Sequence, residues 1–286
     1  MKRLSFPLAL FLAAILHAAT ARAQAPLPGI GTPSYSPAEL DRIVSPIALY
    51  PDPLLAQVMA AATYPDDIPD AARWADTHHR YTGAQLTEAI VADQLPWDPS
   101  VQALLPFQSV LHMMADDMAW TQELGDAVLA EHAEVMDAVQ RMRHDAWKYG
   151  YLRSNNEVIV TSTPFIEIRP IGPGVIAVPL YDPRIVFAAP RRGFAVATAI
   201  RFGPGVRLGV GFDPWGWSGA RLVWPSHTVI INRTPWERTR ANRTTYVHPY
   251  AVRRYAGRQP IERHEVRPED DHPRHARRAD DRRHSS

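Results

Sequence analysis

The spacing of apolar residues changes near residue 154, and this change limits the folds that the chain can adopt. Before that point, apolar residues recur at intervals of three and four, as in Leu54, Leu55, Val58 and Met59, which share one stripe of a helix. After it, residues 157–163 and later stretches are β-branched and follow the period of two typical of strands. We therefore predict an α+β protein, with an N-terminal array of short helices followed by a β-rich antiparallel region.

Prolines divide the first half into short helices. Ser36, followed by Pro37 and Glu39, matches a capping box with proline at the first helical position. Asp52 and Asp98 each precede a proline and an apolar helical stripe, so their side chains are expected to cap two further helices.

A glycine-rich turn divides the later part of the β-rich region. Residues 194–202 and 206–212 alternate in character on either side of Gly203, Pro204 and Gly205. This arrangement predicts a hairpin.

The first 23 residues have the pattern of a secretion signal. A short basic start precedes residues 4–16, a mostly apolar run that is too short to cross a bilayer. Ala21 and Ala23 are the small residues that a signal peptidase reads, so the mature chain is predicted to begin at Gln24. A retained N-terminal anchor helix is the alternative. No later segment reaches about 18 apolar residues, so no transmembrane segment is expected in the mature chain.

Charge is unevenly distributed along the chain. A linker at residues 24–35 leads to an acidic helical domain at 36–153, with 18 acidic and 7 basic side chains and a net charge of −11. The β-rich domain at 154–232 carries +3, and the tail at 233–286 carries +6, with 14 arginines against 8 acidic residues. The tail is predicted to be largely disordered.

The tail's charge bears on the partners of the chain. Anionic envelope polymers or lipid head groups fit an exported basic tail. Export argues against nucleic acid as the intended partner. The acidic front and the basic tail indicate separate partners or contact between the two ends.

Signals for catalysis are weak. The chain has no cysteine, which excludes thiolate metal sites and thiol nucleophiles. It also lacks a nucleophile elbow, a phosphate loop and a metal-binding histidine spacing, so no cofactor, metal ligand or catalytic residue is assigned. Asp98, Asp116 and Asp182 are the weak candidates for a carboxylate site. His112 lies four residues before Asp116 and pairs with it either as a base with its orienting carboxylate or as an ordinary surface pair.

Longer stretches carry a family resemblance. They are residues 45–57 (SPIALYPDPLLAQ), 60–65, 97–101 (WDPSV), 113–121, 136–140 (MDAVQ) and 175–183 (VIAVPLYDP). Over about residues 37–232 the chain resembles a bacterial exported family known as domain of unknown function 3300. It departs from the family pattern at Arg201 and Arg207, which interrupt a typically more apolar run. The resemblance implies export and a helical-then-β layout, and supplies no reaction, cofactor or catalytic residue.

Together these features favour an exported cell-envelope interaction or scaffold protein, periplasmic or secreted in a bacterium. Its basic tail would contact anionic envelope polymers. The alternative is a periplasmic hydrolase that acts on such polymers through carboxylates. Such an enzyme needs two ionisable groups that converge at roughly 5–9 Å in a concave site, whereas a scaffold needs only exposed surfaces.

Overall fold

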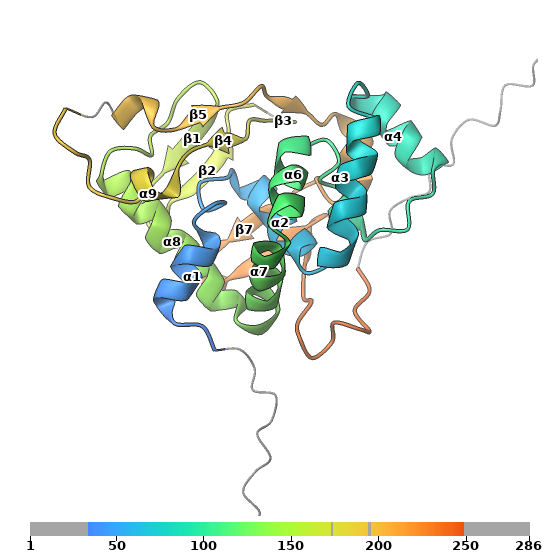
Figure 1. Cartoon of the computed structure of the whole chain (residues 1–286), viewed down its shortest axis with the longest axis horizontal. Coiled ribbons are helices and arrows are strands. Elements are labelled where there is room, and N and C mark those ends of the chain that lie inside the picture. The colour runs from blue at the N-terminus through green and yellow to red at the C-terminus, as the bar shows by residue number, and fades with distance from the viewer. Residues whose placement is uncertain (1–33, 173, 194–195, 249–286) are drawn as a thin grey trace, which may run out of the picture.

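The computed structural model describes residues 34–172, 174–193 and 196–248 (Figure 1). Within these residues, every α-helix except the short one at Pro183–Val186 comes before the first strand, which confirms the predicted α+β class. The helices are α1 (Pro37–Val44), α2 (Asp52–Ala62), α3 (Ile68–Thr77), α4 (Gly83–Ala92), α5 (Pro99–Gln102), α6 (Gln108–Asp116), α7 (Met118–Ala130), α8 (His132–Lys148) and α9 (Pro183–Val186). Short 3-10 helices are η1 (Pro65–Asp67), η2 (Val196–Thr198), η3 (Val210–Trp215) and η4 (Trp224–Ser226).

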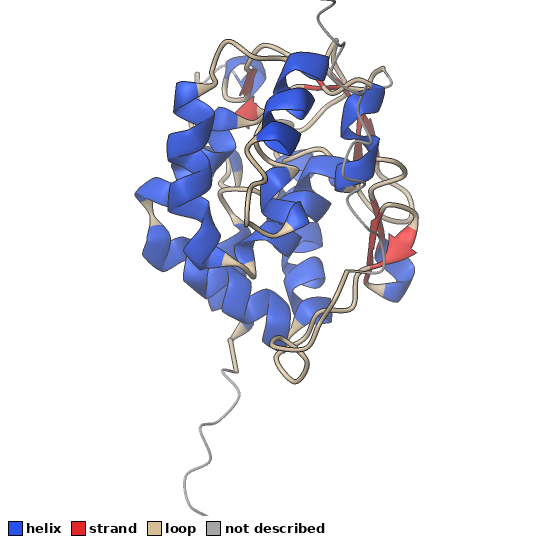
Figure 2. Cartoon of the chain, turned by 90° about the vertical axis from the view of Figure 1, so that its right-hand side faces the viewer, coloured by secondary structure: helices blue, strands red, loops and turns tan. Residues whose placement is uncertain are grey.

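The strands form small antiparallel sheets, as predicted. Figure 2 shows helices over most of one side of the molecule, with strands at its edges. The paired strands are β1 (Val158–Thr161) with β2 (Glu167–Pro170), β3 (Val175–Ile176) with β6 (Val206–Arg207), β4 (Pro179–Leu180) with β5 (Arg201–Phe202), and β7 (Arg221–Val223) with β8 (Thr228–Ile231) and β9 (Thr234–Pro235).

The predicted hairpin around Gly203 is wrong. Strands β5 and β6 flank the turn but do not pair with each other; β5 pairs with β4, and β6 pairs with β3. The reason is burial, because Ile176 and Val178 on the β3–β4 segment lie in the core. Pairing with that segment satisfies the backbone of β5 and β6 and brings Leu208 into the same core.

Helix α2 lies at the centre of the molecule. Every residue of α2 except Pro53 is buried, as expected for a helix that is apolar on all sides. It contacts α5, α7, β2, β7 and β8, and Figure 1 shows it near the middle of the ribbon. A Cβ at Gly125 on α7 would lie 2.1 Å from the carbonyl oxygen of Ala62. Only glycine therefore permits the close approach of these two helices.

The helix starts follow the predicted capping, except at Asp52. The Ser36 hydroxyl accepts a hydrogen bond from the Glu39 amide, and the Ser36 amide donates to the Glu39 carboxylate, so the capping box is confirmed. Asp98 accepts a hydrogen bond from the Ser100 amide at 2.9 Å and caps α5. The prediction for Asp52 is wrong, because Pro51 is the N-cap of α2 and Asp52 makes no capping hydrogen bond.

Asp52 is instead the partner of a fully buried arginine, Arg143 of α8. Arg143 Nη1 donates to Asp52 Oδ1 at 2.6 Å and to the Ile166 carbonyl at 2.9 Å. Its Nε donates to the Ala48 carbonyl at 2.8 Å, and its Nη2 donates to the Tyr50 carbonyl at 2.9 Å. A buried charge is tolerated only when it is paired and hydrogen-bonded, and this guanidinium meets both conditions.

The β-rich region completes this ion pair. Trp224 Nε1 donates to Asp52 Oδ2 at 3.2 Å, and its ring centroid lies 4.9 Å from the Arg143 guanidinium carbon. The Ile168 amide on β2 lies 3.4 Å from Asp52 Oδ1. The pair therefore fastens the helices to β2 and to the turn that follows β7.

One apolar core runs from the helices into the β-rich region. It contains helical residues such as Leu54 and Met59 together with Phe212, Trp224 and Val229. A smaller core lies between the end of α8 and the first strands; its buried members are Leu49, Ala146, Tyr151, Leu152, Val158, Ile166, Ile168 and Val186. The β-rich region thus packs against the helices through both of these cores.

Residues 233–248, here called the C-terminal segment, pack on this core. Strand β9 pairs with β8, and Trp236 is buried, with its amide donating to the Val229 carbonyl at 2.8 Å. The Arg240 amide donates to the Leu129 carbonyl at the end of α7 at 3.0 Å. The fold therefore continues past residue 232, the predicted start of the tail, and includes the described residues up to His248.

Candidate functional site

The three candidate carboxylates lie on separate elements. Asp98 caps α5, Asp116 ends α6 and is exposed, and Asp182 caps α9. Asp182 accepts hydrogen bonds from the amide and the guanidinium of Arg184. Within the described ranges, no hydrogen bond or ion pair joins any two of the three carboxylates, and the structure does not bring them into one site.

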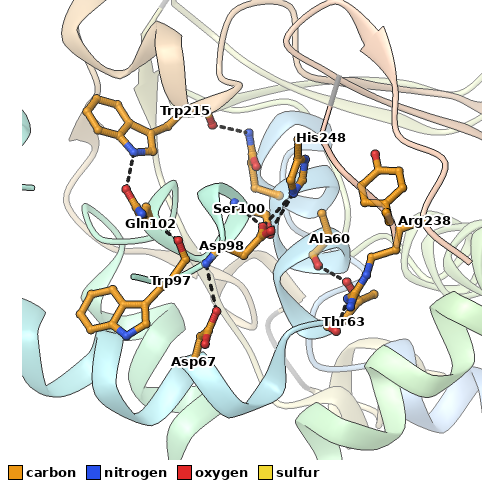
Figure 3. A network of polar contacts seen from close by, with 12 residues as sticks. Ala60, Thr63, Asp67, Trp97, Asp98, Ser100, Gln102, Trp215, Arg238 and His248 are labelled. Carbon is orange, nitrogen blue, oxygen red and sulfur yellow. Dashed lines mark hydrogen bonds and ion pairs between the residues drawn. The ribbon is translucent and has the colours of Figure 1, made fainter. Parts of the chain in front are cut away.

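Asp98 alone lies in a polar cluster (Figure 3). His248 Nε2 lies 2.9 Å from both Asp98 carboxylate oxygens. The Ser100 hydroxyl donates to Asp98 Oδ1 at 2.6 Å, and the Asp98 amide donates to Asp67 Oδ2 at 2.9 Å. The rings of Tyr64 and His248 are stacked, with 6.1 Å between their centroids. The cluster thus joins η1, α5 and the end of the C-terminal segment.

The Asp98 cluster is closed to solvent. The side chains of His248 and Asp98 are 6% and 10% exposed, and Ser100 is fully buried. Burial raises the pKa of Asp98, but the hydrogen bond and charge of His248, with the hydrogen bonds from Ser100, outweigh it and hold this pKa below its ordinary value. Burial raises the pKa of Tyr64, and the nearby Asp98 carboxylate adds to that rise. Because Ser100 is buried and bonded to a carboxylate rather than to a histidine, it is not placed to attack a polymer.

Arg238 forms a second fastening of the same segment. Its guanidinium carbon lies 3.6 Å from the Tyr64 ring centroid, a cation–π contact. Nη1 donates to the Thr63 carbonyl, and Nη2 donates to the Arg243 carbonyl at 3.0 Å. The arginine thus ties the C-terminal segment to the end of α2 and closes the turn within the segment.

A series of hydrogen bonds beside the Asp98 cluster holds η3 against the helices. Trp215 Nε1 donates to Gln102 Oε1 at 2.8 Å, and Gln102 Nε2 donates to the Trp97 carbonyl at 2.8 Å (Figure 3). Gln57 on α2 lies with its Nε2 3.4 Å from the Trp215 carbonyl. These contacts serve packing, since they link backbone and side chains that are far apart in sequence.

The histidines of the helical part do not assemble a site. His112 Nε2 lies 2.7 Å from Asp76 Oδ1, so its partner is Asp76 and not Asp116. Burial, together with the nearby His227, lowers the pKa of His132 to about 4. The part of the chain that the structure describes holds no group of three or more His, Asp or Glu side chains placed to bind a metal ion.

A groove of about 660 Å³ opens between α8 and the β1–β2 loop. We call it the α8 groove. Among its lining residues are Asp41, Gln140, Arg141, Asp145, Trp147 and Phe165. None of these residues was predicted to have a functional role. The sequence held one local indication of this groove: charged and aromatic residues lie between the buried positions of α8.

Partners within the chain engage two of the three carboxylates that line the α8 groove. Arg141 Nε donates to Asp41 Oδ1 at 2.8 Å, and His227 Nε2 lies 2.8 Å from Asp137 Oδ1. The Gln140 side chain exchanges two hydrogen bonds with the Ile166 backbone, one donated and one accepted. Hydrogen bonds therefore fix several side chains of the groove, whose lining contains more carboxylates than cationic groups.

The predicted cleavage residues Ala21, Ala23 and Gln24 lie outside the described residues. Among the helices that the structure describes, none is both long enough and apolar enough to cross a membrane.

Comparison with known proteins identifies the chain's relatives. The chain is 35% identical over 208 residues to "Uncharacterized protein YacH" of Escherichia coli (strain K12). This match covers 61% of the chain and 33% of YacH, so the chain corresponds to about a third of that relative's length. No solved structure matches the chain. A family model described as "Protein of unknown function (DUF3300)" matches residues 36–259, and the chain belongs to this family.

Proposed function

We propose that the chain is an exported cell-envelope protein that binds anionic envelope polymers through its basic tail and uses its folded part as a scaffold. In this role the folded part supports the tail and does not catalyse a reaction. Its ligand would be recognised by charge and not by sequence.

The fastening of the C-terminal segment carries this proposal. His248, Arg238 and Arg240 each bond to the helical part through the contacts described above. The sequence that follows residue 248 contains 10 arginines and 7 acidic residues. A basic sequence attached at a fixed point to a folded body is the arrangement expected of a protein that tethers its folded part to an anionic polymer.

The geometry gives less support to the hydrolase alternative. Glycoside hydrolysis by acid and base needs two carboxyl groups about 5–9 Å apart beside the substrate. Asp98 is enclosed, while Asp116 and Asp182 lie on other helices with different surroundings.

Binding measurements with charge-altered tails test the proposal. Wild-type protein should bind alginate, an anionic polysaccharide, at 50 mM salt and lose most of that binding at 500 mM, since screening shortens from about 10 Å at 0.1 M to about 3 Å at 1 M. Changing the arginines beyond residue 248 to glutamine should abolish binding, and changing them to lysine should preserve it. Salt-independent binding, or equal binding by the glutamine variant, would contradict the proposal. Export is checked separately by N-terminal sequencing of the native protein, which should start at Gln24.

A further inference from the structure

We propose that the α8 groove binds a segment of uncharged glycan. The inference goes beyond the tail's proposed role and rests on the proposed function only in that an exported protein meets envelope glycans. The groove's volume of about 660 Å³ falls within the range of about 300–1,000 Å³ that small-molecule sites occupy.

The charge state of the α8 groove selects the class of ligand. Asp41 is paired with Arg141, and Asp137 is paired with His227. Asp145 is then the remaining carboxylate, and no ion pair engages it in the described part of the chain. The lining has three carboxylates and one arginine, an excess of acidic groups that repels a polyanion. Two of the carboxylates already have partners within the chain, which a polycation would have to displace, so an uncharged ligand fits better than either.

The groove's hydrogen-bonding groups suit hydroxyls. Asp145 and Asp137 offer acceptor oxygens, while Arg141 offers donors and His144 offers either according to its tautomer. A sugar hydroxyl both donates and accepts, so a wall that mixes the two kinds of group can bond to a polyhydroxylated chain. A fatty acyl chain would leave these groups without hydrogen-bond partners, which weakens binding.

Trp147 supplies the apolar surface that a sugar ring needs. It is 38% exposed, among the large apolar side chains of the described residues that remain open to solvent. The Arg153 guanidinium carbon lies 5.6 Å from its ring centroid, and the His144 ring centroid lies 6.2 Å away, so the indole is held between two neighbours. The C–H face of a pyranose ring is apolar and can stack on such an indole while its hydroxyls reach the polar wall.

Calorimetric titration of full-length protein with tetra-N-acetylchitotetraose, an uncharged β-linked glycan, tests the inference. We expect binding of similar strength at 50 mM and 500 mM salt, because no ion pair is formed. Trp147→Ala should weaken it at least about tenfold, or about 1.4 kcal/mol, and Trp147→Phe should keep part of it. Tyr81→Ala is the matched control, since Tyr81 is a 45% exposed aromatic residue that does not line the groove, and it should bind as wild type does.

Three outcomes would overturn the inference. They are no binding of the glycan, binding that Trp147→Ala leaves unchanged, and binding of tetra-arginine in place of the glycan with loss of that binding in Asp145→Asn. The last result would make the groove a site for cationic peptides. The glutamine-substituted tail separates the two proposals, because it should bind the glycan normally while failing to bind alginate.

Discussion

Two buried ion pairs join distant parts of the chain, and they differ in what they hold. The side chains of Arg143 and Asp52 are 0% and 6% exposed, and those of His248 and Asp98 are 6% and 10% exposed. Arg143 also donates to three backbone carbonyls at the centre of the molecule. His248 meets one helix start at the end of the C-terminal segment. The two pairs are thus similarly buried but differ in what they hold. The Arg143–Asp52 pair, here called the central clamp, joins elements at the centre of the molecule. The His248–Asp98 pair, here called the peripheral fastening, holds the end of the C-terminal segment.

Breaking the central clamp should have the largest effect. Arg143→Met would leave the Asp52 carboxylate buried without a cation and three carbonyls without their donor. We expect a loss of about 3–5 kcal/mol in the free energy of unfolding, measured by urea denaturation. The double variant Arg143→Met/Asp52→Asn should recover part of the loss, because it removes the stranded charge. A single variant as stable as wild type would contradict the role of the clamp.

Breaking the peripheral fastening should cost less. Asp98→Ala removes the cap of α5, worth about 1 kcal/mol, and also the carboxylate that His248 contacts, for a total of about 2 kcal/mol. Asp98→Asn keeps an oxygen that can cap the helix and should lose less, which separates the two contributions in the same urea experiment. If Asp98→Ala left stability unchanged but abolished hydrolysis of an envelope polymer, the hydrolase alternative would gain.

Lowering the pH should weaken the peripheral fastening, the contact between Asp98 and His248. The folded-state pKa of Asp98 lies below its ordinary value, which is about 3.9 in unfolded chains. The stability that this carboxylate contributes is therefore complete above about pH 4 and is lost as the pH falls through the lower, folded-state pKa. The indole NMR signal of Trp236 should report this release in wild type, and the acid-induced change should shrink in Asp98→Asn.

The smallest effect is expected at Asp182. This residue has the same capping hydrogen bond as Asp98, and each caps a four-residue helix, but Asp182 lies at the surface and pairs with an exposed arginine. Asp182→Ala should therefore lower the free energy of unfolding by less than Asp98→Ala does in urea denaturation. A loss as large as that of Asp98→Ala would show that the buried histidine adds nothing at Asp98.

The sequence predicted what depends on neighbouring residues. The capping box at Ser36 and the cap at Asp98 follow from two or three adjacent positions, and both are present. The order of helices and antiparallel strands follows from apolar periodicity in the same way. At Asp52 the same local pattern failed, because the partner that decides its role lies 91 residues away.

The candidate sites depended on contacts that the sequence does not display. His248 lies 150 residues from Asp98 in a basic, polar stretch without a strong apolar pattern, so it was assigned to the tail. Arg143 left one signal: it lies four residues after Val139, on the stripe that faces the core. A charged residue on a buried stripe needs a buried partner, so this position could have identified Arg143 as a member of a buried ion pair.

Hydrogen exchange of the C-terminal segment measures whether the Asp98–His248 pair fastens residues 233–248 to the helices. Mass spectrometry should find the amides of Trp236, Arg240 and Tyr246, which are hydrogen-bonded in the structure, protected in wild type and exposed in His248→Ala, with the protection of α2 and α8 unchanged. Exchange of these amides at the rate of an unstructured peptide in the wild type, or equal protection in both proteins, would contradict this role of the pair.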